Sequence, residues 1–299
     1  MIENTEKEEG LFMCTAVAFH AGGLLFGRNM DLEYSFNENI VLTPRNYVFK
    51  FSNGEVNSKG YAMIGIATVK EMYPLYAEAM NEKGVAMAGL NFPGQAYYGC
   101  EKESKINISP FEFIPWILRK YSCVQDIRRD IDSINLYNHP FSENLPLAPL
   151  HWMISDQKES IVIESMKDGL HIHENPFHVL TNNPPFSYHY WNIHRLGNIS
   201  TRNVWSEDME KMNLIPYAQG MGAMGLPGDA SSPSRFLRAW FYLSNSTIEE
   251  DEDKNIAQVF HILSNVAMIK GGVVTDNKEN DLTRYSCCMD TTNFRYYYK

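Results

Sequence analysis

A glycine-rich turn between two short apolar segments, close to the N-terminus, constrains the fold of this chain more than any other feature. Glycines in so short a connection between two apolar runs predict a β-hairpin. A two-residue turn at Gly22-Gly23 would place Cys14 opposite Asp31, whereas a turn one residue earlier would place it opposite Asn29. Both registers bring charged residues of the second strand close to the cysteine.

The cysteine of this hairpin, Cys14, follows Met13, and removal of the methionine would leave a thiol and a free α-amine on one residue. A thiol is a nucleophile, and an α-amine with a usual pKa of about 7.7–8.0 is a base near neutral pH. Arg28 beside the sulfur would favour the thiolate, and Asp31 would accept from the α-ammonium. Because residues three apart face opposite ways on a regular strand, we expect a bend or an end near Met30. An edge hairpin with a structural cysteine is the alternative.

Composition excludes several classes of function. The chain has 299 residues, 44% of them apolar, which suffices for one large core or at most two domains. A formal charge of -10 argues against nucleic-acid binding. No apolar run is long enough to span a membrane, and the first 12 residues are acidic, unlike a secretory signal. The 5 cysteines have irregular spacings that predict neither a disulfide framework nor a zinc site. We therefore predict a cytoplasmic protein without metal or cofactor.

Strand-like and helix-like segments come in blocks, which favours α+β layers over a doubly wound parallel sheet. Helices are predicted at residues 111–121, 126–134, 188–196, 234–243 and 255–264, and the first follows a capping-box sequence, Ser109-Pro110-Phe111-Glu112. Strands are predicted at 14–20, 24–28, 47–51, 61–69 and 84–90, as one consecutive antiparallel sheet, and then at 151–155, 160–164, 169–173, 283–290 and 294–298.

Two familiar motifs match in sequence but lack the neighbouring elements or ligands that their function requires. The glycines of residues 220–225 match the dinucleotide fingerprint, but no strand clearly precedes them and Leu226-Pro227-Gly228 follows where a helix would begin. His171 and His173 would share one face of a strand, yet no third metal ligand stands at a useful spacing. Loop glycines and a surface strand are the better interpretations.

Two asparagine loops and one arginine are less easily explained by structure alone. Residues 89–93 and 180–185 each end a strand with an asparagine and a proline, which are ordinary turn residues but also supply donors for an oxyanion. Ser232 and Pro233 predict a helix start with Ser232 as N-cap, which puts Arg235 in the first turn. A cation is disfavoured there by the helix dipole, and this indicates a functional demand.

Longer motifs occur in a fixed order from Met13 almost to the last residue. They are Met13-Cys14-Thr15-Ala16, Phe26-Gly27-Arg28-Asn29-Met30-Asp31, Thr43-Pro44-Arg45-Asn46-Tyr47, Gly89-Leu90-Asn91-Phe92, Ser109-Pro110-Phe111-Glu112-Phe113-Ile114-Pro115-Trp116, Leu145-Pro146-Leu147, Thr181-Asn182-Asn183-Pro184, and Gly225-Leu226-Pro227-Gly228-Asp229 through Ser234-Arg235-Phe236. In this order they resemble the choloylglycine hydrolases, the bile salt hydrolase and penicillin V acylase family of N-terminal-nucleophile (Ntn) enzymes. The resemblance implies the Ntn-hydrolase fold, an αββα sandwich of two antiparallel sheets, usually assembled as a homotetramer.

The resemblance also implies a role for each site residue. Cys14 is expected to be the nucleophile and, through its α-amine, the proton shuttle, with Arg28 and Asp31 beside it. The backbone N–H of Asn91 and the side-chain amide of Asn182 are expected to form the oxyanion hole. We expect residues 14–299 to be a single catalytic domain and residues 1–13 an extension or propeptide whose presence keeps the enzyme inactive.

The remaining implications concern the pocket and the substrate. Arg235 is similar to the arginine that completes the family's polar site, and Met30, Phe36 and apolar residues within 134–147 are expected to line a sterol-sized pocket. An asparagine at position 91 resembles the bile salt hydrolases, whereas penicillin V acylases tend to carry tyrosine. A conjugated bile salt is therefore the predicted substrate. A penicillin V acylase or other N-acyl amide hydrolase is the first alternative, and a non-catalytic bile-acid- or lipid-binding relative the second.

Overall fold

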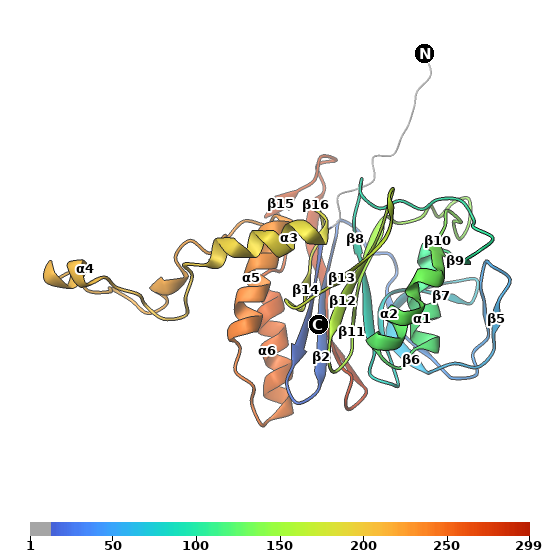
Figure 1. The fold of residues 1–299 in the computed structure, drawn as a ribbon, viewed down its shortest axis with the longest axis horizontal. Coiled ribbons are helices and arrows are strands. Elements are labelled where there is room, and N and C mark those ends of the chain that lie inside the picture. The colour runs from blue at the N-terminus through green and yellow to red at the C-terminus, as the bar shows by residue number, and fades with distance from the viewer. Residues whose placement is uncertain (1–12) are drawn as a thin grey trace, which may run out of the picture.

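Two antiparallel sheets packed face to face, with helices on both outer sides, make up the computed structural model, which describes residues 13–299 (Figure 1). Sheet A has the order β14-β1-β2-β16-β15, with β17 also paired to β16. Its strands are β1 (Met13–His20), β2 (Leu24–Leu32), β14 (Val179–Leu180), β15 (Val273–Val274), β16 (Asn280–Asp290) and β17 (Arg295–Tyr298).

Sheet B lies against sheet A and has the order β13-β12-β11-β8-β7-β6-β3. Two small pairs, antiparallel β4-β5 and parallel β9-β10, flank it. The strands of these three sheets are β3 (Asn39–Thr43), β4 (Phe49–Lys50), β5 (Val56–Asn57), β6 (Met63–Lys70), β7 (Tyr73–Asn81), β8 (Ala86–Asn91), β9 (Ile106–Ile108), β10 (Ile134–Leu136), β11 (Leu150–Ser155), β12 (Ser160–Met166) and β13 (Gly169–Glu174).

The outer helices complete four layers, as predicted. Helices α1 and α2 cover sheet B, and α5 and α6 cover sheet A (Figure 1). The helices are α1 (Phe113–Lys120), α2 (Val124–Asp130), α3 (Phe186–Asn192), α4 (Glu207–Lys211), α5 (Ser232–Asn245) and α6 (Glu252–Ser264), with short 3-10 turns at Pro110–Glu112, Ile131–Ser133, Ile193–Leu196 and Met221–Ala223. None of the described helices is long and apolar enough to cross a membrane.

Alternation along the strands of sheet B separates two hydrophobic cores. In β8, Ala86 and Ala88 face sheet A, whereas Met87 between them faces α1. In β11, Met153 faces sheet A and Trp152 faces α1, where it packs edge to face on Phe113 with ring centroids 4.9 Å apart. Successive strand residues point to opposite faces, so one strand supplies both cores.

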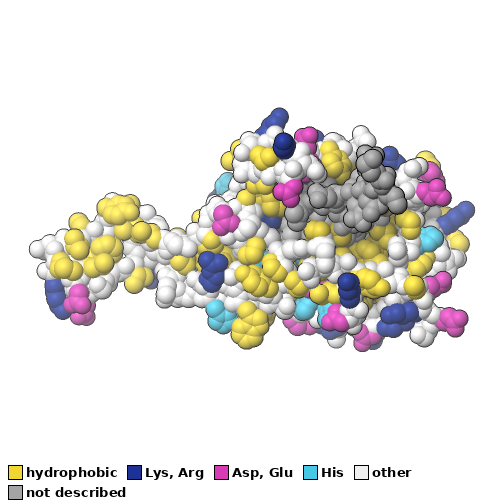
Figure 2. Space-filling model, turned by 90° about the horizontal axis from the view of Figure 1, so that it is seen from above, with side chains coloured by type: hydrophobic (Ala, Val, Ile, Leu, Met, Phe, Trp, Pro, Cys, Tyr) yellow, Lys and Arg dark blue, Asp and Glu magenta, His cyan; other side chains and the backbone are white. Residues whose placement is uncertain are grey.

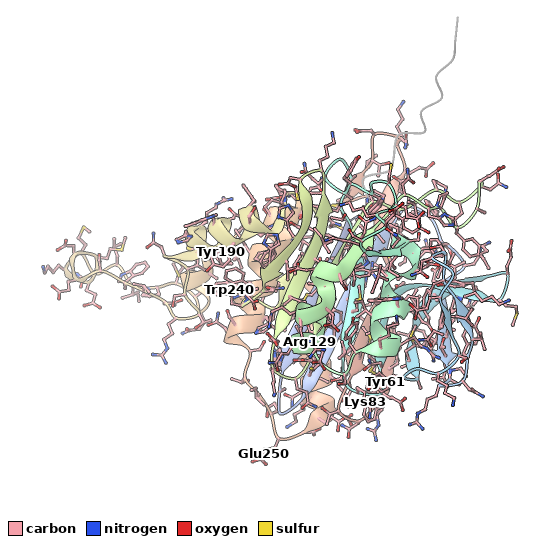
Figure 3. The ribbon with its side chains drawn as sticks, turned by 45° about the vertical axis from the view of Figure 1, so that its right-hand side comes forward. Tyr61, Lys83, Arg129, Tyr190, Trp240 and Glu250 are labelled. Atoms are coloured by element: carbon pink, nitrogen blue, oxygen red, sulfur yellow. The ribbon has the colours of Figure 1, made fainter. Side chains whose placement is uncertain are left out.

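The first helix starts as its sequence predicts. The Glu112 carboxylate accepts the Ser109 backbone N–H at 3.1 Å and also the Ser52 backbone N–H at 2.7 Å. Helices α3 and α5 are joined by aromatic contacts in which Phe177 lies 5.2 Å from Tyr190 and 6.0 Å from Trp240, measured between ring centroids (Figure 3). These contacts fix α3 and α5 relative to each other near the end of β14, which Asn182 follows.

The N-terminal hairpin exists, but both predicted registers are wrong. Cys14 stands opposite Met30, because the turn contains three residues and not two. Ala21 N–H donates to Gly23 O at 2.9 Å, and Gly22 between them has a positive φ of 74°, which glycine adopts at little cost. The odd number of turn residues shifts the pairing to a register between the two that were predicted.

The prediction of one consecutive early sheet is also wrong. Strands β1 and β2 belong to sheet A, whereas β6 and β8 belong to sheet B, together with β7, which was not predicted. Pro74, alanines and Glu78 give β7 a composition of low β-propensity. Its place in the sheet is decided by its neighbours on both sides and not by its own residues.

Strands β7 and β8 pair over only three positions, from Glu78–Ala88 to Met80–Ala86. Beyond Glu78 and Ala88 the pairing stops, and residues of both strands, Ala77 and Gly89 among them, line a cavity. The end of this pairing is what makes room for a pocket within an otherwise packed sandwich.

Candidate active site

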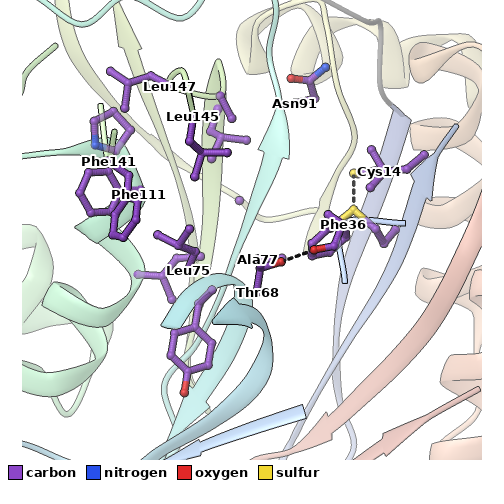
Figure 4. A pocket seen from close by; sticks show the side chains of 18 of the residues that line it. Cys14, Phe36, Thr68, Leu75, Ala77, Asn91, Phe111, Phe141, Leu145 and Leu147 are labelled. Carbon is purple, nitrogen blue, oxygen red and sulfur yellow. Dashed lines mark hydrogen bonds between the residues drawn. The ribbon is translucent and has the colours of Figure 1, made fainter. Parts of the chain in front are cut away.

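A cavity of about 460 Å³ lies at the interface of the two sheets and reaches the outer layer at α1 (Figure 4). Cys14, Arg28 and Asn91 line one part of it, and Asn37, Thr68 and Lys70 also belong to its lining. Most of the remaining lining is aromatic or aliphatic and includes Phe36, Phe111, Phe141, Leu145, Leu147 and Trp152. Met30 and Phe36, which were expected to contact the substrate, line this cavity. Such a wall, with few polar groups at one end, suits an apolar ligand with one polar, reacting end.

Cys14 is buried, with 2% of its surface exposed, and its thiol faces this cavity. The sulfur lies 3.4 Å from Arg28 Nη2 and 3.8 Å from Met30 Sδ. Burial alone would lower the pKa of Arg28, but the neighbouring Cys14 and Glu78 raise it, so the guanidinium stays a cation beside the sulfur. A fixed cation at this distance favours the thiolate form of a cysteine.

Asp31 does not reach the sulfur, contrary to the expected bend. Strand β2 continues without interruption to Leu32, and Arg28 and Met30 face the cavity while Asp31 faces the opposite way. The irregularity lies instead in β16, where the pairing with β2 shifts between Thr283 and Tyr285. Asp31 accepts from Thr283 Oγ1 at 2.5 Å, and burial raises its pKa to about 6 although Arg235 lowers it.

The side-chain amide of Asn182 forms hydrogen bonds through both its oxygen and its nitrogen. Its Oδ1 accepts from the Cys14 backbone nitrogen and from Arg235 Nη2, both at 2.8 Å, and its Nδ2 donates to Asn91 O at 2.8 Å. Because both Oδ1 partners are donors, the amide orientation is fixed, and the Nδ2 group faces the cavity end of β8. The predicted residues Cys14, Asn91, Asn182 and Arg235 therefore come together from four separate segments of the chain.

Arg235 lies in the first turn of α5, fully buried, where its cationic side chain serves the site rather than the helix. It donates to Cys14 O at 2.5 Å and to Thr15 Oγ1 at 2.7 Å, besides its bond to Asn182. The N-cap lies one residue earlier than predicted: it is Ser231, and Ser232 Oγ instead accepts the Asn182 backbone N–H at 2.9 Å. Backbone and side chain of Asn182 are thus both tied to α5.

Several buried residues behind Asn182 were not identified from the sequence. His151 Nε2 donates to Thr181 O at 2.8 Å and its Nδ1 lies 3.1 Å from Glu164 Oε1. His189 Nε2 donates to Asn182 O at 3.0 Å, and burial lowers the pKa of His189 to about 4. Two histidines thus hold consecutive carbonyls of the asparagine loop. A lone histidine within an apolar strand, as at 151, was the available signal.

Glu78 is a further buried residue that was not identified from the sequence. Its carboxylate is fully buried in β7 of sheet B and lies 2.8 Å from Arg28 Nη1 of sheet A. An acidic residue between alanines of a strand is a signal that this position has a buried partner.

Two weak sequence motifs, the glycines of residues 220–225 and the pair His171 and His173, are not part of this site. The glycines of residues 220–225 lie in a loop around the 3-10 turn Met221–Ala223, not between a strand and a helix. His171 pairs with Asp168 and His173 lies 3.2 Å from Glu164. Among residues 13–299 no group of three or more His, Cys, Asp or Glu side chains is arranged to hold a metal ion.

A second buried carboxylate beside Asp31 predicts a pH-dependent stability. Asp281 is fully buried, and burial together with the charge of Asp31 raises its pKa to about 7, although Arg235 and the Met13 backbone N–H lower it. A raised carboxyl pKa favours the folded state below the usual value near 3.8, and this contribution is lost as the pH rises through 7.

Asp281→Asn removes this ionisation, so its stability relative to the parent is expected to increase by about 2–3 kcal/mol between pH 5 and pH 8. Urea unfolding at the two pH values measures the difference. Asp276→Asn, at an exposed position of the preceding turn, is the control and is expected to show no such change. Equal effects of Asp281→Asn at both pH values would contradict the prediction.

Comparison with known proteins assigns nearly the whole chain to one family. Residues 14–299 match the family described as linear amide C–N hydrolases, choloylglycine hydrolase family. The chain is 46% identical to the bile salt hydrolase/transferase of Lactiplantibacillus plantarum over 287 residues, which are 96% of this chain and 89% of that protein.

Solved structures with a similar fold are also found. A mutant conjugated bile acid hydrolase from Clostridium perfringens matches with a TM-score of 0.88 and 39% identity, over 96% of this chain and 88% of that one. Penicillin V acylase from Agrobacterium tumefaciens matches with a TM-score of 0.75 over 96% of this chain and 82% of that one, at 19% identity, which shows the fold alone. The predicted αββα fold is confirmed.

Proposed function

The chain belongs to the choloylglycine hydrolase family and is a linear amide C–N hydrolase, and on this premise we propose that it hydrolyses conjugated bile salts, releasing glycine or taurine. The observation that carries the proposal is the cavity: a buried thiol beside an arginine lies at one end of a pocket of about 460 Å³ whose other walls are mostly apolar. A conjugated bile salt is divided in the same way, because its steroid acyl group is apolar and the amide at its end is polar. Asparagine at position 91 and the names of the relatives support the same substrate class.

In the proposed mechanism the Cys14 thiolate attacks the amide carbonyl carbon. The resulting oxyanion accepts hydrogen bonds from the backbone N–H of Asn91 and from the Asn182 side chain. One N–H of that amide is used by Asn91 O, and the other has no partner among the described residues. Donors fixed before the reaction stabilise developing charge most effectively. Arg235 would hold this amide in place, and Ser232 would hold the Asn182 backbone.

Collapse of the tetrahedral intermediate breaks the C–N bond and leaves the bile acid as a thioester on Cys14. The departing amine takes a proton from the α-ammonium of Cys14, whose nitrogen lies 2.8 Å from Asn182 Oδ1. The α-amine of Cys14 then takes a proton from water, the resulting hydroxide attacks the thioester, and the bile acid leaves as the Cys14 thiolate is restored. Asp31, on the far face of β2, would act on this centre through Arg235 and not by direct contact.

Parallel assays of glycocholate, taurocholate and penicillin V test the substrate. We expect hydrolysis of the two bile salts, with penicillin V cleaved at least about tenfold more slowly, because an asparagine at 91 and a long apolar pocket fit the steroid better. Released glycine and taurine are measured by amine derivatisation. Hydrolysis of penicillin V alone would contradict the proposal and favour the acylase alternative. Bile salt binding that is unchanged in Cys14→Ser, without any turnover, would favour the non-catalytic alternative.

A second reaction of the same thioester is also proposed, because the relative from Lactiplantibacillus plantarum is named a hydrolase and a transferase. An amine in place of water would attack the acyl-cysteine and form a new amide. Glycocholate incubated with an excess of a second amino acid would then yield the exchanged conjugate.

The predicted domain arrangement and assembly remain proposals. Residues 1–12 of the expected propeptide lie outside the described residues, and Met13 is the first residue of β1. The predicted homotetramer is supported by an arm, residues 197–231, that extends away from the sandwich and carries α4 (Figure 1). Large apolar side chains are exposed along it, among them Val204 at 75%, Ile215 at 77% and Tyr217 at 81% (Figure 2). An apolar surface of this kind fits contact with further copies of the chain.

A further inference from the structure

Arg28 presents its two terminal nitrogens to different partners. Nη2 lies 3.4 Å from Cys14 Sγ and 3.5 Å from Met30 Sδ. Nη1 donates to Glu78 Oε2 at 2.8 Å and to Ala77 O at 2.6 Å. Because the guanidinium is planar and its donors form a rigid fork, partners that hold Nη1 also determine where Nη2 lies. Glu78 and the Ala77 carbonyl thus set the position of the cation at the thiol.

Glu78 is in turn held by the last two strands of the chain. Tyr285 of β16 donates to Glu78 Oε2 at 2.8 Å, and Tyr296 of β17 donates to Oε1 at 2.8 Å. The thiol of Cys287 lies 3.8 Å from Oε1. Among residues 13–299, these groups and Arg28 are the titratable side chains in contact with the carboxylate, and they come from β2, β16 and β17. Burial raises the pKa of both tyrosines well above the usual value, so they remain protonated donors.

The carboxylate affects the thiol through charge as well as through position. Glu78 is fully buried, so it interacts with Arg28 with little screening by water. Hydroxyl donors spread its negative charge, and without one of them more of that charge acts on the thiol. Without the carboxylate, the Arg28 cation is uncompensated and attracts the thiolate more strongly. The two changes therefore shift thiol ionisation in opposite directions.

We propose that Glu78, together with Tyr285 and Tyr296, is a positioning group for the reaction: it fixes Arg28 against Cys14 and balances the charge that Arg28 presents to the thiol. The C-terminal strand β17 is by this means part of the active-site support, although its residues do not touch the cavity. The inference rests on the proposed role of Cys14 as nucleophile.

The experiment compares Glu78→Gln, Tyr296→Phe and the control Tyr297→Phe with the parent, all as full chains beginning at Cys14. Tyr297 is the next residue of β17 and faces the other way, so its substitution removes the same atom without reaching Glu78. Two quantities are measured: kcat and KM for glycocholate, and the pH midpoint of Cys14 alkylation by iodoacetamide, followed by peptide mass spectrometry. Alkylation of the exposed Cys100 in the same samples serves as an internal standard.

We expect Tyr296→Phe to lower kcat on the order of tenfold with KM nearly unchanged, because it weakens a hydrogen bond to a charged group. Its alkylation midpoint should rise by about half a pH unit, whereas that of Glu78→Gln should fall, although Glu78→Gln also loses kcat. Tyr297→Phe should change neither quantity.

Midpoints that move in the same direction, or a kcat of Tyr296→Phe within twofold of the parent, would overturn the inference. Tyr296→Phe and Tyr285→Phe carry the test alone if Glu78→Gln does not fold. A parent that shows the alkylation midpoint but no bile salt turnover would instead refute the proposed substrate, and the opposite shifts would still decide the role of Glu78.

Discussion

Replacement of Cys14 by alanine is expected to abolish hydrolysis of glycocholate, with kcat/KM lower by a factor of at least about 10⁴. The sulfur is the group that forms the thioester, and among the described cysteines it alone lines the cavity. Arg28 Nη2 lies 3.4 Å from this sulfur and contacts no other cysteine among residues 13–299. Release of glycine from glycocholate measures the loss, and isothermal titration measures whether the substrate still binds.

Cys100→Ala is the matched control, because Cys100 is exposed and does not line the cavity. Its activity should equal that of the parent. Substantial hydrolysis by Cys14→Ala would refute the nucleophile assignment and, with it, the thioester. A loss of folding in Cys14→Ala would be visible as a lower melting temperature, and Cys14→Ser, which is closer in size, then repeats the measurement.

Chains that keep residues ahead of Cys14 are expected to be less active by a factor of about 10²–10⁴, the usual contribution of a general base. An amide nitrogen has no lone pair for proton transfer, whereas the free amine accepts and returns a proton in both halves of the reaction. In the structure the Cys14 nitrogen belongs to a peptide bond and donates to Asn182. Cleavage after Met13 would turn this donor into an α-ammonium at the same place.

Two preparations, one beginning at Met1 and one at Met13 with the methionine removed, test this dependence. Intact-mass spectrometry gives the fraction of chains that begin at Cys14, and glycocholate hydrolysis should be proportional to that fraction. The Cys14→Ala variant of each preparation is the control for background hydrolysis. Full activity from chains that still begin at Met1 would contradict the α-amine mechanism.

Local sequence was a good guide to single elements. The capping box at Ser109 and Glu112 formed, and most predicted helices and strands lie within a few residues of the observed ones. Strand β7 escaped because its alanines, proline and Glu78 lack the β-branched pattern by which strands are identified. Its partners in sheet B, which are distant in sequence, supply what its own residues do not.

The family's motifs identified the members of the candidate site, and the structure gathers them around Asn182. The register of the hairpin was not predictable, because a three-residue turn and a two-residue turn use the same glycines. One step of register turns every side chain to the other face. This is why Asp31 was expected at the sulfur and lies instead on the far side of β2 with Arg235.

The sequence by itself determined the chemistry that is available: a cysteine after a methionine, an arginine and two asparagine loops in the order of an amide hydrolase family. Only the tertiary structure decided which groups act together. Arg28 is oriented by Glu78 of the other sheet, and Glu78 by tyrosines near the end of the chain. Such contacts depend on how two sheets pack, and the packing of faces far apart in sequence leaves no local pattern to read.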